Sequence, residues 1–412
     1  MPAIQAKHRT INRKQNIPDI RFAGFKNEWE EVSFGDLFQF KQTNSFSRDD
    51  LNYEQGKVKN IHYGDIHTKF GANFDVVKEI VPFINTDIDI SNIKKDNYCI
   101  EGDLVIADAS EDYEDVGKAI EIRNLNNEKV VAGLHTLLAR PVSESFAPGF
   151  LGYLMRSKTV RHQIKILAQG TKVLGIAPRY LSEVLFKIPS KEEQQRITSF
   201  LESIDDLLGN LRIQRKYLNA YKIGMMQKIF SQEIRFKDKK GEDFPEWEDK
   251  RLGDICEKES SHVSANSLDD NNGEYKIYGA SGLLKKIDFY NEEQPYISIV
   301  KDGAGVGRLL LCDAKSSVLG TLDIIKPKTK VNLYFLYLTL GRVNFIKYVI
   351  AGTIPHIYFK DYKKVKITLA SFPEQQMIAD FFSAIDKIIE NKNRQIHQVA
   401  QWKKGLMQQL FI

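Results

Sequence analysis

The feature that most constrains the fold is a long segment that occurs twice. Residues 193–230 align without a gap onto residues 374–411, an offset of 181 positions (374 − 193), and 14 of the 38 aligned pairs are identical. In both copies apolar residues recur at seven-residue intervals, with further members four residues on, as in a helix that packs against another helix. A helix of 38 residues is about 57 Å long at about 1.5 Å per residue. The sequence therefore predicts two long, similar helices that pack as an antiparallel pair.

The repeated segments also define a candidate helix–helix core. The apolar series begins at Ile197 in the first copy and at Ile378 in the second. Two unrelated core helices would also be amphipathic, but they would not share residues at a constant offset. Arg215 and Lys392 fall at inner positions, where a polar residue can fix register at some cost in stability. The predicted core residues of the helix pair are Ile197, Ile204, Leu208, Leu211, Leu218, Met225, Ile378, Ile385, Ile389, Val399 and Leu406.

The segments that precede the two helices resemble each other at their edges. Residues 27–37, NEWEEVSFGDL, match residues 245–255, PEWEDKRLGDI, and the Gly-Thr turn of 167–173 matches that of 349–355. The chain is therefore predicted to be a tandem of domain, helix, domain and helix. The predicted segments are a flexible basic N-terminal arm at 1–16, a first domain at 17–189, a central helix at 190–232, a second domain at 233–369 and a C-terminal helix at 370–412.

Each globular segment combines short β-like runs with one helical run. Residues 57–68, 103–110 and 130–141 of the first segment are bounded by Gly, Asp or Pro and favour strands and turns. The helical runs are residues 146–170 and 332–352. We expect two α+β domains in which β-structure dominates, joined by two long helices that form an antiparallel coiled coil with an internal pseudo-twofold repeat.

Composition excludes several classes of protein. No run of 18 apolar residues exists, which argues against a membrane span, and the N-terminus lacks the apolar stretch of a secretory signal. Cys99, Cys256 and Cys312 have no CxxC spacing, so neither a disulfide framework nor a zinc site is indicated. The net charge of +5 favours nucleic acid only weakly, although lysines cluster in and beside the second domain. We expect a cytoplasmic protein.

No catalytic or metal site is predicted. The run GAGVG at 303–307 lacks the GxGxxG spacing and lies between β-like runs, and VGKA at 116–119 lacks the flanking residues of a P-loop. No Asn-Pro-Pro-Tyr-like tetrapeptide of an amino-methyltransferase is present. His62 and His67 are five residues apart in a strand-like run, which is poor geometry for a shared metal ion.

Better candidates for binding are polar, glycine-containing turns that occur in both domains. YGDIHT at 63–68 has a counterpart in YGASG at 278–282, and ADASED at 107–112 has one in VKDGAGVG at 300–307. Glycine lets the backbone approach a ligand closely, and the polar side chains supply donors and acceptors for base edges and phosphates. Plain hairpin turns would explain any one of them equally well. The candidate DNA-contacting residues are Tyr63, Asp65, His67, Asp108, Lys118, Tyr278, Ser281, Lys301, Asp302 and Arg308, with Lys172 and His356 after the Gly-Thr turns.

The order of domains and helices resembles the specificity subunit of a type I restriction–modification system. The resemblance covers the chain from about Ile17, and its carriers are IPDIRFAGFKNEWEEVSFGDL, IPSKEEQQRITSFLESIDDLL with its echo LASFPEQQMIADFFSAIDKII, VVAGLHTLLARP, QGTKVLGI and VKDGAGVGRLLL. The second copy departs at the hinge, where Ala370 stands in place of Pro189. That departure leaves the angle of the second domain open.

The resemblance implies a function without catalysis in this chain. It implies two target recognition domains that each read one half of a split site in double-stranded DNA. It also implies that the paired helices, with the core residues named above, dock two methyltransferase (modification) subunits. S-adenosylmethionine would bind to those subunits, and ATP and Mg²⁺ to partner restriction and translocase subunits. This chain would hold no cofactor.

Two other functions are compatible with parts of the sequence. A coiled-coil scaffold protein would explain the helices but not two matched globular domains with glycine-rich polar loops. A stand-alone DNA-modifying enzyme would need motifs that we do not find. DNA binding in complex with a modification subunit would argue against the scaffold, and activity of the isolated chain on DNA would favour the enzyme.

Overall fold

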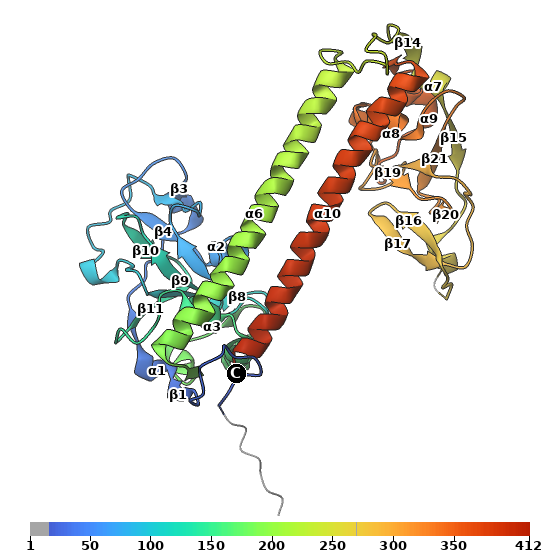
Figure 1. Ribbon diagram of the computed structural model, residues 1–412. Helices are drawn as coiled ribbons and strands as arrows, with labels where there is room; N and C mark the ends of the chain where they lie inside the picture. The colour runs from blue at the N-terminus through green and yellow to red at the C-terminus, as the bar shows by residue number, and fades with distance from the viewer. Residues whose placement is uncertain (1–15, 269) are drawn as a thin grey trace, which may run out of the picture. The chain divides into compact units, whose positions relative to one another are not determined.

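The computed structural model describes residues 16–268 and 270–412, which form two compact units. Unit 1 is the described chain up to Arg212 together with Arg394–Ile412, and unit 2 is the rest, from Ile213 to Asn393. Two long helices, α6 (Lys191–Phe230) and α10 (Phe372–Leu410), each contribute one end to each unit; they are green and red in Figure 1. Of the predicted arm at 1–16, only Asn16 lies within the described residues.

The domain of unit 1 is built on two mixed sheets. Their strand orders are β2-β11-β7-β9-β5 and β10-β4-β6-β3, and the pairs β1-β13 and β12-β8 stand apart. Helix α3 packs on β9 and helix α2 on β7. The elements are β1 (Glu30–Ser33), α1 (Phe34–Leu37), β2 (Phe38–Lys41), η1 (Arg48–Asp50), β3 (Leu51–Asn52), β4 (Lys59–Ile61), α2 (Tyr63–Thr68), β5 (Asn73–Asp75), β6 (Phe83–Ile84), η2 (Lys95–Asn97), β7 (Leu104–Ala107), β8 (Ala109–Ser110), β9 (Ala119–Asn124), β10 (Val130–Ala132), β11 (Thr136–Pro141), α3 (Phe150–Met155), α4 (Lys158–Leu167), β12 (Leu174–Gly175), α5 (Pro178–Leu181) and β13 (Leu185–Ile188).

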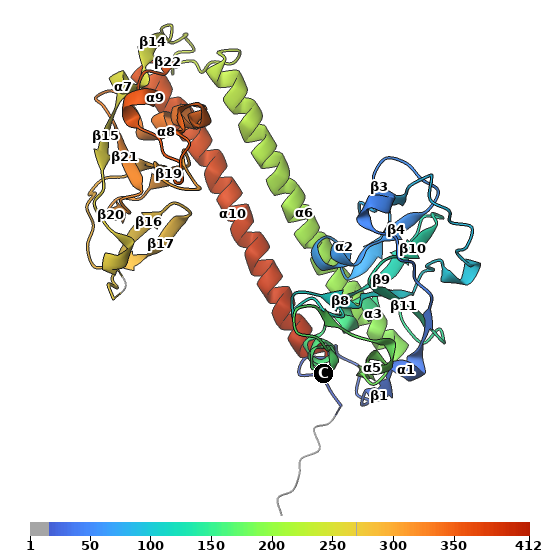
Figure 2. The same cartoon turned by 180° about the vertical axis from the view of Figure 1, so that it is seen from behind.

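The domain of unit 2 repeats this plan with fewer strands. Its sheets have the orders β15-β21-β18-β19 and β17-β16-β20, with the pair β14-β22. Helix α8 packs on β18, β19 and β21, and Figure 2 shows α8 with β19 and β21 from behind. The elements are β14 (Glu248–Arg251), α7 (Leu252–Ile255), β15 (Cys256–Ser260), η3 (Ala265–Leu268), β16 (Tyr275–Gly279), β17 (Gly282–Ile287), β18 (Tyr296–Val300), β19 (Leu309–Cys312), β20 (Ser316–Val318), β21 (Leu322–Pro327), α8 (Leu333–Gly341), η4 (Phe345–Tyr348), α9 (Phe359–Tyr362) and β22 (Lys366–Leu369).

Both long helices start in the same way. The Gln194 side chain accepts a hydrogen bond from the Ala147 backbone N–H and donates one to the Pro189 carbonyl. Gln375 makes the equivalent bonds, accepting from a backbone N–H of the second domain and donating to the Ala370 carbonyl. Because the acceptor is a backbone carbonyl in both cases, the exchange of Pro189 for Ala370 at the hinge leaves this contact unchanged.

Within each unit the apolar stripes of the two helices are covered by their domain and by the other helix. In unit 2, Arg215 lies opposite Asn393 and Lys222 lies opposite Asp386, so the two helices run antiparallel. The expected α+β fold with two β-rich domains and two packed long helices is confirmed. Among the predicted core residues, Ile197, Ile204, Leu208, Leu211, Ile378 and Ile385 are buried, and Leu218, Met225, Ile389, Val399 and Leu406 are partly buried.

The described residues show neither a membrane span nor a metal cluster. No helix within them is long and apolar enough to cross a bilayer. Within residues 16–268 and 270–412 no three or more His, Cys, Asp or Glu side chains are grouped so that they could share a metal ion. All three cysteines are buried free thiols, and burial raises the pKa of the Cys312 thiol to about 11.

Candidate nucleic-acid interface

Helix α2 carries three of the predicted contact residues, Tyr63, Asp65 and His67. The sequence pattern favours a strand and a turn over residues 57–68, but the structure has the short strand β4 followed by this helix. The helix starts because His62 Nδ1 accepts a hydrogen bond from the Gly64 backbone N–H at 3.2 Å, which caps the first turn. Tyr63 and His67, four residues apart, therefore lie on one side of the helix.

Four aromatic and imidazole rings cluster at this helix. The Tyr63 ring lies 4.6 Å from His62, 5.5 Å from His67 and 5.3 Å from His135, measured between ring centroids. Burial, helped by the nearby Arg48 cation, lowers the pKa of His62 to about 4, and burial also lowers the pKa of His67. These two imidazoles are neutral at pH 7. His62 Nδ1 is already used by the Gly64 N–H, so that ring can offer a ligand only the donor at Nε2, and His67 Nε2 is buried without a hydrogen-bond partner among the described residues.

Asp65, a residue of the same helix, is completely buried and binds two cations. Its carboxylate accepts hydrogen bonds from Arg48 Nη1 at 2.9 Å and Arg48 Nη2 at 2.8 Å, and Lys69 Nζ lies 2.8 Å away. Although burial opposes ionisation, the bonds from Arg48 and Lys69 hold the pKa of Asp65 below its ordinary value. The Asp65 side chain therefore faces the interior, and the cations that it holds face solvent.

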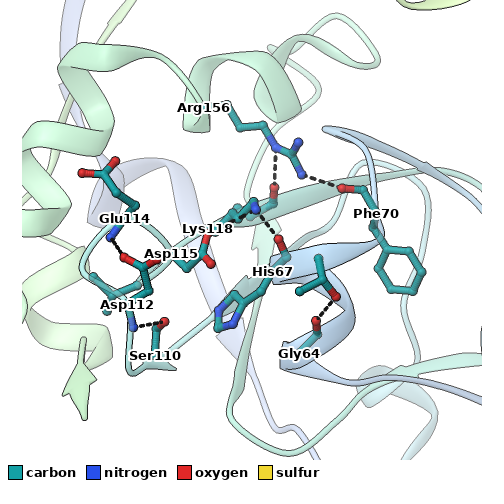
Figure 3. Close-up of polar contacts among 12 residues, drawn as sticks. Gly64, His67, Phe70, Ser110, Asp112, Glu114, Asp115, Lys118 and Arg156 are labelled. Atoms are coloured by element: carbon teal, nitrogen blue, oxygen red, sulfur yellow. Dashed lines mark hydrogen bonds and ion pairs between the residues drawn. The ribbon is translucent and has the colours of Figure 1, made fainter. Parts of the chain in front are cut away.

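Lys118 and Asp108 lie beside the ring cluster. Lys118 Nζ donates to the His67 backbone carbonyl and, at 3.2 Å, to the Asp115 carboxylate, as Figure 3 shows. His135 Nδ1 lies 3.5 Å from Asp108 Oδ1, and burial raises the pKa of the Asp108 carboxyl. The structure thus brings four of the candidate residues of the first domain together, Tyr63, His67, Asp108 and Lys118.

The loop between β8 and β9 is held by its own polar groups. Ser110 Oγ accepts from the Asp112 N–H, and the Asp112 carboxylate accepts from the Glu114 N–H. Arg156 ties the end of α3 to carbonyls of neighbouring segments, including that of Phe70 at 3.0 Å (Figure 3). Lys172 is exposed in the turn before β12, which pairs with β8. The bonds of Ser110 and Asp112 fix the loop that ends at Lys118, a candidate contact residue.

In the second domain, two turns of the candidate set are joined by side-chain and backbone bonds. Arg308 Nη1 donates to the Ala280 carbonyl at 2.8 Å, linking the glycine-rich turn to the turn that contains the exposed Ser281. Asp302 and His356 form a backbone bridge next to that turn. The structure thus brings Ser281, Asp302, Arg308 and His356 into one region of unit 2.

Two further candidates of the second domain have internal partners. The Tyr278 hydroxyl donates to Asp313 at 2.9 Å, and the Tyr278 side chain is almost completely buried. Lys301 Nζ lies 4.0 Å from the carboxylate of Asp323, which is also buried, and Lys258 Nζ lies 3.7 Å from it. A buried carboxylate therefore holds two cations in this domain as well, at longer distances than in the first.

Contacts at the helix ends of unit 1 were not predicted. Arg21 Nε and Nη2 each donate to the Glu193 carboxylate at 2.7 Å. The Asp205 carboxylate accepts from the Tyr153 hydroxyl at 2.8 Å and pairs with Lys403 at 2.5 Å. Both carboxylates belong to identical pairs of the sequence repeat, which was the available signal for them.

Unit 2 has the same contacts at its helix ends. Arg235 donates to the Glu374 carboxylate from Nε at 3.2 Å and from Nη2 at 3.0 Å. The Asp386 carboxylate accepts from the Tyr334 hydroxyl and pairs with Lys222 at 2.5 Å. The sequence repeat thus extends to the side-chain contacts that attach each domain to the helices.

Comparison with known proteins identifies the family. The family described as Type I restriction modification DNA specificity domain matches residues 26–216 and 245–401. The putative type I restriction enzyme MjaX specificity subunit of Methanocaldococcus jannaschii is 26% identical over 423 aligned positions, which cover 96% of this chain and 95% of that protein.

Solved structures show the same fold. A type I restriction–modification S subunit from M. genitalium is similar with a TM-score of 0.62 at 16% identity, covering 96% of this chain and 99% of that one. A chain from a structural study of complex assembly and conformational transition in the type I system is similar with a TM-score of 0.54 at 16% identity, covering 94% and 99%. Because the family match covers both β-rich domains and most of the chain, this protein belongs to the type I DNA specificity family and is the non-catalytic specificity subunit of a restriction–modification system, in which catalysis lies in the partner subunits.

Proposed function

We propose that the chain reads an asymmetric, bipartite site in double-stranded DNA and holds two copies of one modification subunit. The first half-site would be read by residues 17–189 and the second by residues 233–369, with the helical segments 190–232 and 370–412 setting the gap. The single observation that carries this proposal is that the helix-end contacts occur twice, while the polar surfaces of the two domains differ in composition. Equal domain–helix contacts in the two units, combined with two domains of unlike polar surface, fit an asymmetric DNA site that is modified by two identical partners.

Two equivalent aromatic trios support attachment of two identical partners. In unit 1 the Phe200 ring lies 5.6 Å from Phe22 and 6.1 Å from Trp402. In unit 2 the rings of Phe236, Phe381 and Tyr221 repeat this arrangement, with 5.7 Å between the first two and 6.4 Å between the last two. Trp402 and Tyr221 are each 51% exposed. Exposed aromatic groups are common anchors in protein interfaces, so we assign each trio to one modification subunit.

A pocket at an equivalent place in each unit supports the same assignment. The pocket of unit 1, of about 500 Å³, lies beside the β1-β13 pair and includes Lys158 and Lys187. The pocket of unit 2, of about 470 Å³, lies beside the β14-β22 pair and includes Lys347 and Lys366. Basic side chains outnumber the single acidic one in each lining, Glu31 in unit 1 and Asp249 in unit 2, so one acidic segment of a partner present in two copies would fit both.

The two readers would use different chemistry. In the first domain we propose contacts from Tyr63, His67, Asp108, Lys118 and Lys172, in which the neutral His67 imidazole can donate to or accept from a base edge. In the second we propose contacts from the basic and polar residues of the joined turns, namely Ser281, Lys301, Asp302, Arg308 and His356. Asp65 and Tyr278, whose side chains face the interior, would act by holding neighbouring groups.

The remaining parts of the assembly lie outside this chain. We propose that the modification subunits bind S-adenosylmethionine and methylate adenine, and that restriction and translocase subunits use ATP and Mg²⁺. This chain would hold no cofactor, and we place it in the cytoplasm, where its DNA substrate is found.

Mapping of methylated adenines tests the proposal. In cells that express this chain with its cognate modification subunit, we expect a split motif with two unlike halves around a fixed gap. Replacing Arg308 and Lys301 by Ala together should change one half and leave the other half and the gap intact. A contiguous motif, or a change in both halves at once, would contradict two independent readers.

A further inference from the structure

Arg48 is a cation whose orientation is unusually well fixed for a partly exposed side chain. It lies in the short helix η1, outside every predicted motif, and its side chain is 41% exposed. Nη1 and Nη2 each donate to one oxygen of Asp65, at 2.9 and 2.8 Å. The Asp65 side chain is 0% exposed, so the carboxylate that orients the guanidinium is itself held in the protein interior.

The charges at this place exceed what the buried carboxylate needs. One cation is enough to compensate a buried carboxylate, yet Asp65 binds both Arg48 and Lys69, each at 2.8 Å at the closest. The Lys69 side chain is 48% exposed. The three groups together carry one surplus positive charge, and both cations are open to solvent. Compensation of Asp65 alone therefore does not account for the pair.

Arg48 keeps donors free for a ligand. A guanidinium has five N–H groups, of which two are committed to Asp65. Beyond these, the described part of the chain gives Arg48 a single further bond, from Nη1 to the Tyr53 hydroxyl at a long 3.4 Å. The edge formed by Nε and Nη2 is consequently a planar pair of donors with a fixed direction, which matches two neighbouring acceptors.

The surroundings of Arg48 belong to the proposed reading surface. Its charge is one cause of the lowered pKa of His62, and the ring of His62 contacts Tyr63. Tyr53 is 52% exposed, and Lys69 Nζ lies 5.5 Å from the centre of its ring. Arg48 thus stands beside aromatic and imidazole groups in a region with excess positive charge.

We infer that Arg48 reads a guanine in the half-site of the first domain, and that Asp65 is its positioning residue. Guanine presents O6 and N7 as adjacent acceptors in the major groove, and a bidentate arginine is their commonest specific partner. A phosphate contact needs only a point charge, which an unrestrained lysine can supply, whereas a guanidinium fixed by a buried carboxylate suits a base edge. This inference rests on the proposed bipartite reading of DNA.

The test uses the full chain in complex with its cognate modification subunits. For the Arg48→Lys and Arg48→Ala variants, methylation rates are measured on duplexes in which each base pair of the wild-type motif is changed in turn. We expect discrimination to fall by about tenfold to a hundredfold at one G·C pair of one half-site and to be unchanged elsewhere. Lys78→Ala is the matched control, since Lys78 is a 74% exposed cation of the same domain that lies 3.9 Å from its carboxylate partner.

A change in the DNA sharpens the result. Replacing that guanine by 7-deazaguanine removes the N7 acceptor, so it should slow the wild-type complex and have little additional effect on Arg48→Ala. Asp65→Asn should lower the discrimination at the same base pair. Arg48→Lys keeps the charge, so it provides the test if the other variants fold poorly.

Two outcomes would overturn the inference. Equal loss of methylation on every duplex would make Arg48 a backbone contact, and unchanged discrimination would make the Arg48–Asp65 pair purely structural. Failure of the proposed function is distinguishable, because the wild-type complex would then show no split motif at all.

Discussion

In both units a tryptophan stands beside the phenylalanine at the C-terminal end of a long helix. The Trp29 and Phe411 ring centroids are 6.4 Å apart in unit 1, and those of Trp247 and Phe230 are 5.8 Å apart in unit 2. The indole Nε1 of Trp247 donates to Glu374 at 3.0 Å, but that of Trp29 is buried and has no hydrogen-bond partner among the described residues. The two attachments therefore share their geometry and differ in how completely their polar groups are satisfied.

The candidate DNA-contacting surfaces of the two domains differ far more than the contacts between each domain and the helices. The first domain combines imidazoles, a tyrosine and an arginine fixed by Asp65, whereas the buried Asp323 of the second holds two lysines at 3.7 and 4.0 Å. The contacts that join each domain to the long helices use one set of residue types twice. The residues that make these contacts on the two helices are therefore under the same constraint. Under the proposed bipartite reading, each domain would contact only its own half-site and would therefore be free to use its own chemistry.

The largest expected effect breaks the attachment. Glu374→Ala removes the acceptor of Arg235 and of the Trp247 indole in a site where the carboxylate is 0% exposed, so unit 2 should lose about 4 kcal/mol. Glu193→Ala removes the acceptor of Arg21 alone and should cost unit 1 less. Urea unfolding followed by hydrogen exchange of each unit measures both values. Equal losses would mean that the indole bond contributes nothing.

The next effect concerns pH and unit 1 alone. Burial raises the pKa of Glu121 from its ordinary 4.5 to about 7, against the N–H groups of Gly149 and Gly152 that bind its carboxylate. The folded state holds the Glu121 proton more tightly than the unfolded state does. The Glu121 contribution to the free energy of unfolding, about 3 kcal/mol, is therefore fully present below pH 4.5 and is lost as the pH rises to about 7. Glu121→Gln should remove this part of the pH dependence.

Hydrogen exchange of each unit at several pH values checks this expectation. The difference between wild type and Glu121→Gln should grow between pH 4.5 and 7 in unit 1 and stay near zero in unit 2. The strand of unit 2 that follows the corresponding turn, β19, is Leu-Leu-Leu-Cys and has no carboxylate there. A pH-dependent difference in both units would mean that Glu121 acts on more than its own domain.

A smaller effect tests whether the repeated contacts are equal in energy. Asp205→Ala and Asp386→Ala each remove a carboxylate that pairs with a lysine. The Asp205 side chain is 41% exposed and that of Asp386 is 37% exposed. Such half-exposed pairs are worth about 1 kcal/mol, and the two losses should agree. Double-mutant cycles with Lys403 and Lys222 isolate the pair energies. If the interaction energies from the two cycles differed by more than about 0.5 kcal/mol, the two Asp–Lys pairs would share their geometry but not their contribution to stability.

The sequence allowed the helices and the tandem order to be predicted because an amphipathic repeat is a local pattern. It did not allow helix α2 to be predicted, since that helix depends on the cap at His62 and on the burial of its own residue Asp65. The role of Arg48 could not be predicted for a related reason. Its partner Asp65 is 17 positions away across irregular structure, and no periodic pattern in the sequence connects the two. Lys258 and Asp323, 65 positions apart (323 − 258), meet only when β15 pairs with β21.

The smallest effect on stability carries the most information about partners. Trp402→Ala and Tyr221→Ala each remove a half-exposed ring that touches one neighbouring ring, Phe200 or Phe381, so unfolding should change by less than about 0.5 kcal/mol. Each single variant should nevertheless bind one modification subunit instead of two in native mass spectrometry. Tyr217→Ala, a 69% exposed aromatic of α6 outside the trios, should bind two.

The double variant separates the possible explanations of that result. Loss of both subunits in Trp402→Ala with Tyr221→Ala, together with one subunit in each single variant, requires two independent and equivalent places. Loss of both subunits in either single variant would mean that the two copies stabilise each other's binding. If the double variant still bound two subunits, the aromatic trios would serve only to cover the helices. Binding of the modification subunits would then have to depend on other repeated features, of which the two pockets are the next to test.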